Sequence, residues 1–424
     1  MILLRLKKGL GTPLILIAVF LSTFLFVSHL EVSKIPPTDT PISVAEARPY
    51  AREMPLPGIR RILGAQILVF RSTDYAQVES SIKDLATAGV NTLIVRAFQN
   101  RGDRIYRFAR PRCRVGVYFK TTHAPVVDPV LSRIVSLAHQ HGLRVFAWME
   151  TRKMPLHLPD PEASRAISYR FESKSYGSIP QWSIFDKAVE KRLIGLYHDV
   201  AMSGVDGILI QDDLVMRQNE DFSSKAVTLF EKETGKRLSP KILYSKVFQD
   251  SAGHWCVPNY SDTFWQWACW KNQKLLDLAR KLILSAKGVN PEIEIAMNFM
   301  YESVTNPKNA LAWLSQSLAE AAKLPIDYYA IMAYHRQMRE ELQLSEEATY
   351  NKIAQMTAIM LKLVDNPNKV LMKVQMADWK TRKQISPYEA NQVFNKINSQ
   401  GRVSLAFIPY SPTLPLNVIG HHFH

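Results

Sequence analysis

Short apolar runs alternate with longer amphipathic stretches along most of the chain. The runs are rich in β-branched and aromatic residues, and the stretches repeat apolar positions at helical spacing. Eight runs are predicted to be strands: Leu63–Phe70, Thr92–Phe98, Arg144–Met149, Gly207–Gln211, Glu294–Phe299, Tyr328–Tyr334, Val370–Gln375 and Ser404–Pro409. The predicted helices are Gln77–Ala88, Pro129–His141, Lys187–Met202, Thr263–Ala286, Asn309–Ala322, Glu347–Val364 and Pro387–Asn398. Helix ends are expected at Gly89, Gly142, Gly204 and Gly288, because glycine accepts the left-handed cap conformation.

This alternation predicts an α/β fold with one parallel sheet, and eight strands close into a (β/α)₈ TIM barrel. The barrel is expected to be a single domain over residues 60–412, followed by a tail over residues 413–424. The competing fold is an open doubly wound sheet, but no glycine-rich phosphate loop follows any predicted strand. The longer connections follow the second, third and fourth strands, on the face where barrel enzymes build their active sites.

The amino terminus has the features of a targeting segment. Basic residues at positions 5, 7 and 8 precede an apolar run, Leu14–Val27. Residues 1–30 are therefore predicted to be a signal anchor or signal peptide, and residues 31–59 a Pro-rich linker. No small-x-small cleavage site lies close behind the run, which favours an uncleaved single-pass anchor in the inner membrane with the barrel on the periplasmic, extracytoplasmic side. Secretion after cleavage is the alternative.

The formal net charge of +15 raises the question of a nucleic-acid partner. The basic residues are interpreted as scattered, because no five or six are consecutive, and no nucleic-acid-binding motif is found. A generally basic surface is therefore expected, without nucleic acid. The three cysteines form no Cys-x-x-Cys pair, and no metal or other cofactor is predicted.

The strongest candidate for chemistry is an acid pair, Asp212 and Asp213, after the fourth predicted strand. Successive strand residues point to opposite sides, so only one carboxylate is expected to point into the barrel, while its neighbour holds a loop or a partner. A carboxyl beside an apolar wall and a like charge has a raised pKa, which a general acid for a glycosidic oxygen requires. The alternative is that the pair caps a helix or ties down a loop.

Aromatic, amide and charged residues gather at the other predicted strand ends. Aromatic rings stack on sugar faces, and amides and carboxylates bind hydroxyl groups, so this mixture suits a carbohydrate cleft. The candidate substrate-binding residues are Arg96, Trp148, Glu150, Gln211, Asn298, Tyr301, Tyr334, Gln375, Asp378 and Trp379.

Several segments together resemble one family, the C-terminal glycoside-hydrolase-like domain of the poly-β-1,6-N-acetyl-D-glucosamine N-deacetylases of biofilm export (PgaB). The resemblance covers roughly residues 60 to 410 and is carried by residues 89–92, 97–98, 118–125, 144–149, 185–186, 204–213, 270–278 and 375–379. It implies a barrel that binds partly deacetylated polyglucosamine and cleaves it as an endoglycosidase. In that family, the positions that match Asp212 and Asp213 supply the essential carboxylate. The matching cleft positions include Trp148, Asn298, Tyr334 and Trp379.

The chain also departs from the family. Residues 31–59 are too short and lack the histidines of the family's metal-dependent deacetylase domain, so deacetylation by this chain is not expected. Gln211 stands where the family usually has His, and Arg96 where it usually has Gln. Both changes bear on the identity of the substrate.

The leading hypothesis is an endo-acting hydrolase of an N-acetylglucosamine-type polysaccharide, with one Asp of the pair as general acid. A second carboxylate (Glu150, Glu302 or Asp378) or the substrate's own acetamido group would complete the mechanism. The alternatives are a non-catalytic polysaccharide-binding barrel in export and a hydrolase of another envelope glycan such as peptidoglycan. A cationic polymer needs a locally acidic cleft, whereas a mouth dominated by Arg and Lys favours an anionic or neutral glycan.

Overall fold

The computed structural model describes residues 58–244, 246–249, 255–257, 259–414, 416 and 420–422. The predicted anchor and all but the last two residues of the predicted linker lie outside these ranges. Within them, no helix combines the length and the apolar character needed to span a membrane.

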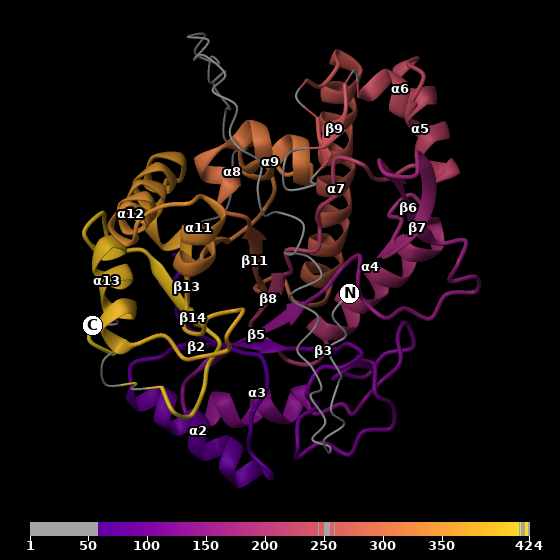
Figure 1. Ribbon diagram of the computed structural model, residues 1–424. Helices are drawn as coiled ribbons and strands as arrows, with labels where there is room; N and C mark the ends of the chain where they lie inside the picture. Colours follow the sequence, from indigo (N-terminus) through magenta and orange to yellow (C-terminus); the bar gives the residue numbers. More distant parts are fainter. Residues whose placement is uncertain are drawn as a thin grey trace, which may run out of the picture.

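Eight parallel strands form a closed barrel, as predicted (Figure 1). Around the barrel they follow the order β1, β14, β13, β12, β11, β8, β5, β2. Nearly every strand residue is buried, because helices cover the outer face and side chains fill the interior. This double burial explains why the strands read as continuous apolar runs. Their bounds are β1 Leu63–Ile67, β2 Thr92–Arg96, β5 Arg144–Met149, β8 Gly207–Ile210, β11 Glu294–Phe299, β12 Tyr328–Ala333, β13 Val370–Gln375 and β14 Ser404–Ile408.

The outer helices lie close to their predicted positions. Their bounds are α2 Tyr75–Thr87, α3 Leu131–Gln140, α4 Lys187–Ala201, α7 Asp262–Val289, α8 Glu302–Thr305, α9 Pro307–Leu314, α10 Leu318–Ala321, α11 His335–Glu341, α12 Glu346–Leu363 and α13 Pro387–Asn398, with a 3₁₀ turn η1 at Pro367–Lys369. The predicted helix 309–322 is broken into α9 and α10, because Ser315 takes a left-handed conformation with φ 49°. The prediction for Gly288 was wrong, since α7 continues to Val289 and ends at Asn290.

Three connections on the carboxyl-terminal side of the barrel carry extra elements. β3 Phe98–Gln99 pairs with β4 Gly116–Val117, and β6 Arg165–Arg170 pairs with β7 Ser175–Trp182. The long connection after β8 holds α5 Ser224–Thr234, α6 Pro240–Leu243, β9 Phe248–Gln249 and β10 Trp255–Cys256. In Figure 1 the β6–β7 hairpin, α5, α6 and the upper part of α7 form a lobe at the upper right. Its core contains Trp267 and Trp270, both buried.

A closed polar network lies at the amino-terminal end of the barrel. Arg144, at the start of β5, forms an ion pair with Glu294, at the start of β11. Its second guanidinium nitrogen donates to Thr92 Oγ1 at 3.1 Å, and the Tyr328 hydroxyl lies 2.9 Å from Glu294 Oε1. These residues start four different strands, so the network joins the strands at this end.

The tail that was predicted for residues 413–424 contacts the barrel in its described part. Leu414 is buried in the main core, and the His422 ring stacks on Phe394 at 5.0 Å. His422 Nε2 also lies 2.8 Å from Asn391 Oδ1.

Candidate active site

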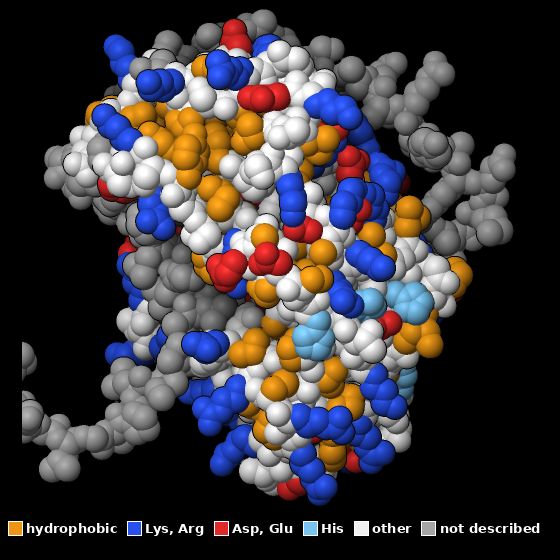
Figure 2. All heavy atoms as spheres, turned by 90° about the vertical axis from the view of Figure 1, so that its right-hand side faces the viewer, with side chains coloured by type: hydrophobic (Ala, Val, Ile, Leu, Met, Phe, Trp, Pro, Cys, Tyr) orange, Lys and Arg blue, Asp and Glu red, His pale blue; other side chains and the backbone are white. Residues whose placement is uncertain are grey.

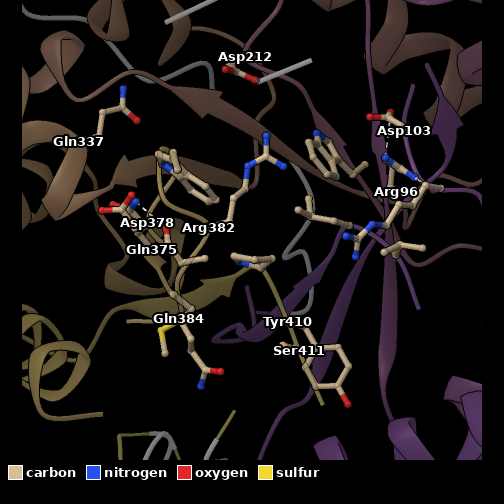
Figure 3. Close-up of a pocket in the computed structure, with 18 of the residues that line it drawn as sticks. Arg96, Asp103, Asp212, Gln337, Gln375, Asp378, Arg382, Gln384, Tyr410 and Ser411 are labelled. Carbon is tan, nitrogen blue, oxygen red and sulfur yellow. Dashed lines mark hydrogen bonds and ion pairs between the residues drawn. The ribbon is translucent and has the colours of Figure 1, made fainter. Parts of the chain in front are cut away.

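A cleft of about 480 Å³ opens at the carboxyl-terminal ends of the strands. Nine of the twelve predicted site residues line it: Arg96, Trp148, Glu150, Gln211, Asp212, Asp213, Gln375, Asp378 and Trp379. Figure 3 shows Arg96 and Asp103 on one side of this cleft, Gln375 and Asp378 on the other, and Asp212 at its upper edge. The barrel therefore brings together residues that lie far apart in the sequence.

The two neighbouring aspartates face different surroundings. Asp213 is 5% exposed and accepts hydrogen bonds from the Thr151 amide at 2.9 Å, the Thr151 hydroxyl at 2.8 Å and the Lys153 amide at 2.8 Å. It therefore ties the loop after β5 to the end of β8. Asp212 is half-buried and lines the cleft, and none of the described residues donates a hydrogen bond to its carboxylate. Both residues lie in the turn after β8, and this turn leaves Asp212 as the available acid.

Glu150 lies deep in the wall of the cleft, close to Asp213. It is 1% exposed, accepts one hydrogen bond from Asn100 Nδ2 at 2.8 Å, and its Oε2 has no partner among the described residues. Burial raises the pKa of Glu150 well above its usual range, and the Asp213 carboxylate adds to the rise. Burial also raises the pKa of Asp213, and hydrogen bonds from the Lys153 and Thr151 amides oppose that rise.

A buried lysine lies in the barrel near Asp212. Lys373, in β13, is 1% exposed, and its Nζ donates to Asn298 Oδ1 at 2.9 Å. Burial lowers the pKa of Lys373 to about 7, an effect that the nearby Asp212 carboxylate partly opposes. Asn298 was predicted to contact substrate, but it does not line the cleft and instead holds Lys373.

Two aromatic pairs form walls of the cleft. Trp148 packs edge-on against Phe98 at 5.4 Å, and its Nε1 donates to the Gln211 side chain. Trp379 packs edge-on against Tyr334, also at 5.4 Å. Tyr334 does not line the cleft, since it lies buried against Trp379. Trp148, Phe98 and Tyr334 are buried, so the partly exposed Trp379 is the ring of these four that offers an apolar face on which a sugar stacks.

Two other predicted residues lie beside the cleft. The Tyr301 hydroxyl donates to Glu341 Oε2 at 2.8 Å instead of facing the cleft. Glu302 lines a separate cavity of about 20 Å³ with Arg217 and Glu341, and burial raises its pKa to about 7. Glu302 is therefore not a second carboxylate of the cleft.

The sequence reasoning missed a second set of cleft residues. Arg71 follows β1, and Tyr410 and Ser411 follow β14, so the strand-end rule would have found them if it had been applied to the first and eighth strands. The turn after Trp379 contributes Arg382, which has φ 63° and extends into the cleft in the direction of Asp212 (Figure 3). Further lining residues come from α11 and the loops: Asp103, Arg104, Lys153, Arg336, Gln337, Glu340, Glu341, Lys380 and Gln384.

Most cleft carboxylates already have partners. Asp103 pairs with Arg96 at 2.9 Å, Asp378 with Arg336 at 3.2 Å, and Glu340 with Lys380. Glu341 accepts from Tyr301. The cleft is thus lined by charges of both signs, and Asp212 is distinguished among the acids by having no such partner in the described chain.

One cluster of basic residues departs from the scattered distribution that was inferred from the sequence. Six arginines occur between residues 101 and 114, and all six are exposed. The rule used on the sequence counted only consecutive charges, so it missed arginines spaced by two or three residues. In Figure 1 the connection between β2 and α3 lies at the lower right, on the side shown in Figure 2, and Lys and Arg outnumber Asp and Glu over the lower part of that face.

Among the described residues, no group of three His, Cys, Asp or Glu side chains is arranged to hold a metal ion.

The sequence and the fold resemble those of carbohydrate-active proteins. A family model described as hypothetical glycosyl hydrolase family 13 matches residues 76–408. The poly-β-1,6-N-acetyl-D-glucosamine N-deacetylase of Escherichia coli K12 is 25% identical over 284 residues, which cover 65% of this chain and 39% of that protein. The chain thus spans about two fifths of the length of that curated relative.

Solved structures give the same fold. The PgaB (BpsB) glycoside hydrolase domain from Bordetella bronchiseptica superposes with a TM-score of 0.66 and 19% identity, covering 86% of this chain and 96% of that one. A β-galactosidase from Halorubrum lacusprofundi gives a TM-score of 0.57 and 11% identity, covering 85% of this chain and 57% of that one. These likenesses establish the barrel fold.

Proposed function

The chain belongs to hypothetical glycosyl hydrolase family 13, and from that premise we propose that it cleaves an N-acetylglucosamine-type polysaccharide internally, with Asp212 as general acid. One observation carries the proposal. Asp213 is held by three donor groups of the loop after β5, while Asp212 beside it lines the cleft and has no hydrogen-bond or ion-pair partner among the described residues. The resemblance to the E. coli deacetylase, and to the glycoside hydrolase domain named above, supports a polymer of the poly-β-1,6-N-acetylglucosamine kind.

In the proposed reaction, Asp212 gives its proton to the glycosidic oxygen as the bond between that oxygen and the anomeric carbon breaks. The other candidate carboxylates are poorly placed for attack: Asp378 is paired with Arg336, and Glu150 is only 1% exposed and accepts a hydrogen bond from Asn100. We therefore assign the attack on the anomeric carbon to the carbonyl oxygen of the substrate's own acetamido group. Water then opens the cyclic intermediate, and the Asp212 carboxylate accepts a proton from that water.

The same proposal places the barrel outside the cytoplasm. It rests on the basic residues and apolar run at the amino terminus, which are typical of a signal anchor. An anchored barrel would act on polymer as the polymer leaves the inner membrane. Signal cleavage would instead release the same barrel into the extracytoplasmic space.

A second candidate is a binding barrel that guides polysaccharide without cleaving it. One observation favours it: Arg96 is held by an ion pair with Asp103 and by a hydrogen bond to the Arg104 carbonyl at 2.7 Å. A cleft wall fixed in this way suits retention of a polymer as well as its cleavage.

The test is a digest by the purified full-length chain. Partly deacetylated poly-β-1,6-glucosamine and peptidoglycan are incubated separately, and new reducing ends are counted against an Asp212→Asn control. The proposal expects reducing ends from the glucosamine polymer, in fragments of several sugars, and none from the control. Retained binding without new reducing ends from either polymer would contradict it and favour the binding barrel.

A further inference from the structure

An arginine-rich loop extends from the cleft, and the proposed function gives it no role. We define the loop as residues 100–115, between β3 and β4. Its exposed arginines are Arg101, Arg104, Arg107, Arg110, Arg112 and Arg114. Asp103 is the only acidic residue in the loop, and its carboxylate is already paired with Arg96.

The loop is fixed to the barrel. Tyr106 is buried, its hydroxyl donates to the Arg96 carbonyl at 2.9 Å, and its ring stacks on Phe108 at 5.3 Å. The Phe108 ring in turn lies 5.0 Å from Tyr75 in α2. The aromatic residues therefore face the domain, which holds the arginines on its outer side at a defined place.

None of the six guanidinium groups forms an ion pair with a described residue. A group of like charges held together on a fixed loop raises the electrostatic energy of the folded protein. Bound anionic groups would lower that energy. Arginine suits them well, because its planar guanidinium binds carboxylate and phosphate groups through paired hydrogen bonds.

The loop is continuous with the cleft. Asn100, at its start, donates to Glu150, and Asp103 pairs with Arg96, so both residues connect it to cleft residues. Arg104 itself lines the cleft, as does the exposed Arg71. A polymer that lies in the cleft and leaves it on this side meets the remaining arginines next.

We propose that the arginine-rich loop is an extension of the substrate cleft that binds anionic groups on the polysaccharide. The preferred substrate is accordingly a glucosamine-type polymer that carries carboxylate, phosphate or sulfate groups. The cationic, partly deacetylated polymer is then a substrate that binds more weakly. The inference rests on the proposed function only in taking the occupant of the cleft to be a polysaccharide. Continuity with the cleft favours a glycan over nucleic acid or an anionic membrane, since neither of these needs Arg104 inside the cleft.

The experiment compares one backbone in three charge states. Oligosaccharides of partly deacetylated poly-β-1,6-glucosamine are used with free amines, with acetylated amines, or with succinylated amines that each carry a carboxylate. Binding to the full-length Asp212→Asn protein is measured by fluorescence anisotropy, so that turnover does not interfere. We expect the succinylated form to bind at least tenfold more tightly than the free-amine form at low ionic strength. Added salt should reduce that preference.

Matched variants locate the effect. Arg107→Gln, Arg110→Gln and Arg112→Gln together should weaken binding of the succinylated form about tenfold and leave the acetylated form within twofold. The control removes three exposed charges elsewhere, by Lys232→Gln, Lys236→Gln and Arg237→Gln, and should change affinity less than twofold.

Three results would overturn the proposal. The first is binding of the free-amine form that equals or exceeds that of the succinylated form. The second is an equal loss in the control, which would show an effect of net charge alone. The third is a loop variant with weakened binding to a DNA 20-mer or to anionic vesicles but unchanged binding to the succinylated glycan. If the wild type cleaves none of the polymers while the preference for the succinylated form persists, the proposed hydrolysis fails and this inference stands.

Discussion

The two ends of the barrel differ in how completely their buried polar groups are hydrogen-bonded. At the amino-terminal end, Arg144, Glu294, Thr92 and Tyr328 bind one another. At the carboxyl-terminal half, several buried polar atoms have no partner among the described residues: both amide atoms of Gln66, Arg96 Nε and Glu150 Oε2. Buried polar groups are normally satisfied, because an unmade hydrogen bond costs stability. The amino-terminal end is therefore organised for stability, and the carboxyl-terminal end retains binding capacity at some cost in stability.

The same contrast recurs between adjacent residues at the cleft. Three donors satisfy Asp213, whereas no described residue donates a hydrogen bond to the Asp212 carboxylate. A carboxylate that accepts hydrogen bonds from the protein stabilises the local structure. One without such bonds can exchange a proton with a substrate. The predictions below separate these two roles.

The largest effect on stability is expected for Asp213→Asn. The amide has one acceptor oxygen in place of two and brings an NH₂ group against the Thr151 and Lys153 amides. We expect a loss of about 3 kcal/mol in the free energy of unfolding, measured by urea denaturation. A loss below about 0.5 kcal/mol would show that the loop after β5 does not depend on this carboxylate.

A smaller loss is expected at the other end of the barrel. Glu294→Gln removes the charge that pairs with Arg144, and both side chains are largely buried. We expect a loss of about 2 kcal/mol in the free energy of unfolding, with the cleavage rate per folded molecule unchanged. A lower cleavage rate with unchanged stability would show that Glu294 serves catalysis, which would contradict a purely stabilising role for the amino-terminal end.

Sequence patterns predicted the frame of the molecule better than its site. The strands were recoverable because each is buried on both faces, so its apolar run is unbroken. The acid pair followed from its place after a strand. Alternation was used to predict that one carboxylate would face inward, but both aspartates lie in the turn after β8, so their orientation depends on that turn. Arg336 and Glu341 were missed because the orientation of α11 toward the cleft depends on tertiary packing. The loop arginines were missed because their exposure, and the absence of ion pairs between their guanidinium groups and other described residues, are properties of the folded chain.

The pH dependence of the free energy of unfolding tests whether the buried Lys373, near Asp212, loses its proton in the folded protein. Burial lowers the pKa of Lys373 and of Lys271 to about 7, whereas an unfolded lysine keeps its proton to about pH 10.4. Between these values the unfolded state binds more protons, so stability rises with pH. Lys373→Met should reduce the slope by about 1.4 kcal/mol per pH unit between pH 8 and pH 10. An unchanged slope in urea denaturation across that range would mean that Lys373 stays charged in the fold.

The smallest effect is expected for Gln66→Leu. Gln66 is fully buried in β1, and neither amide atom has a partner in the described structure. Replacing an unsatisfied amide by an apolar side chain of similar size should raise the free energy of unfolding by about 1 kcal/mol. Destabilisation in a thermal melt would instead show that the amide is satisfied, for example by water, and would weaken the contrast between the two ends.

The proposed function depends most on the different roles of Asp212, as general acid, and Asp213, as a structural carboxylate. The direct measurement is the rate of reducing-end release by Asp212→Asn, alongside its urea denaturation curve and the same data for Asp213→Asn. We predict that Asp212→Asn unfolds within about 0.5 kcal/mol of the wild type and loses at least about a thousandfold in rate. Asp213→Asn should lose stability but keep most of its rate per folded molecule. A stable Asp212→Asn protein that cleaves the polymer within tenfold of the wild-type rate would contradict the account.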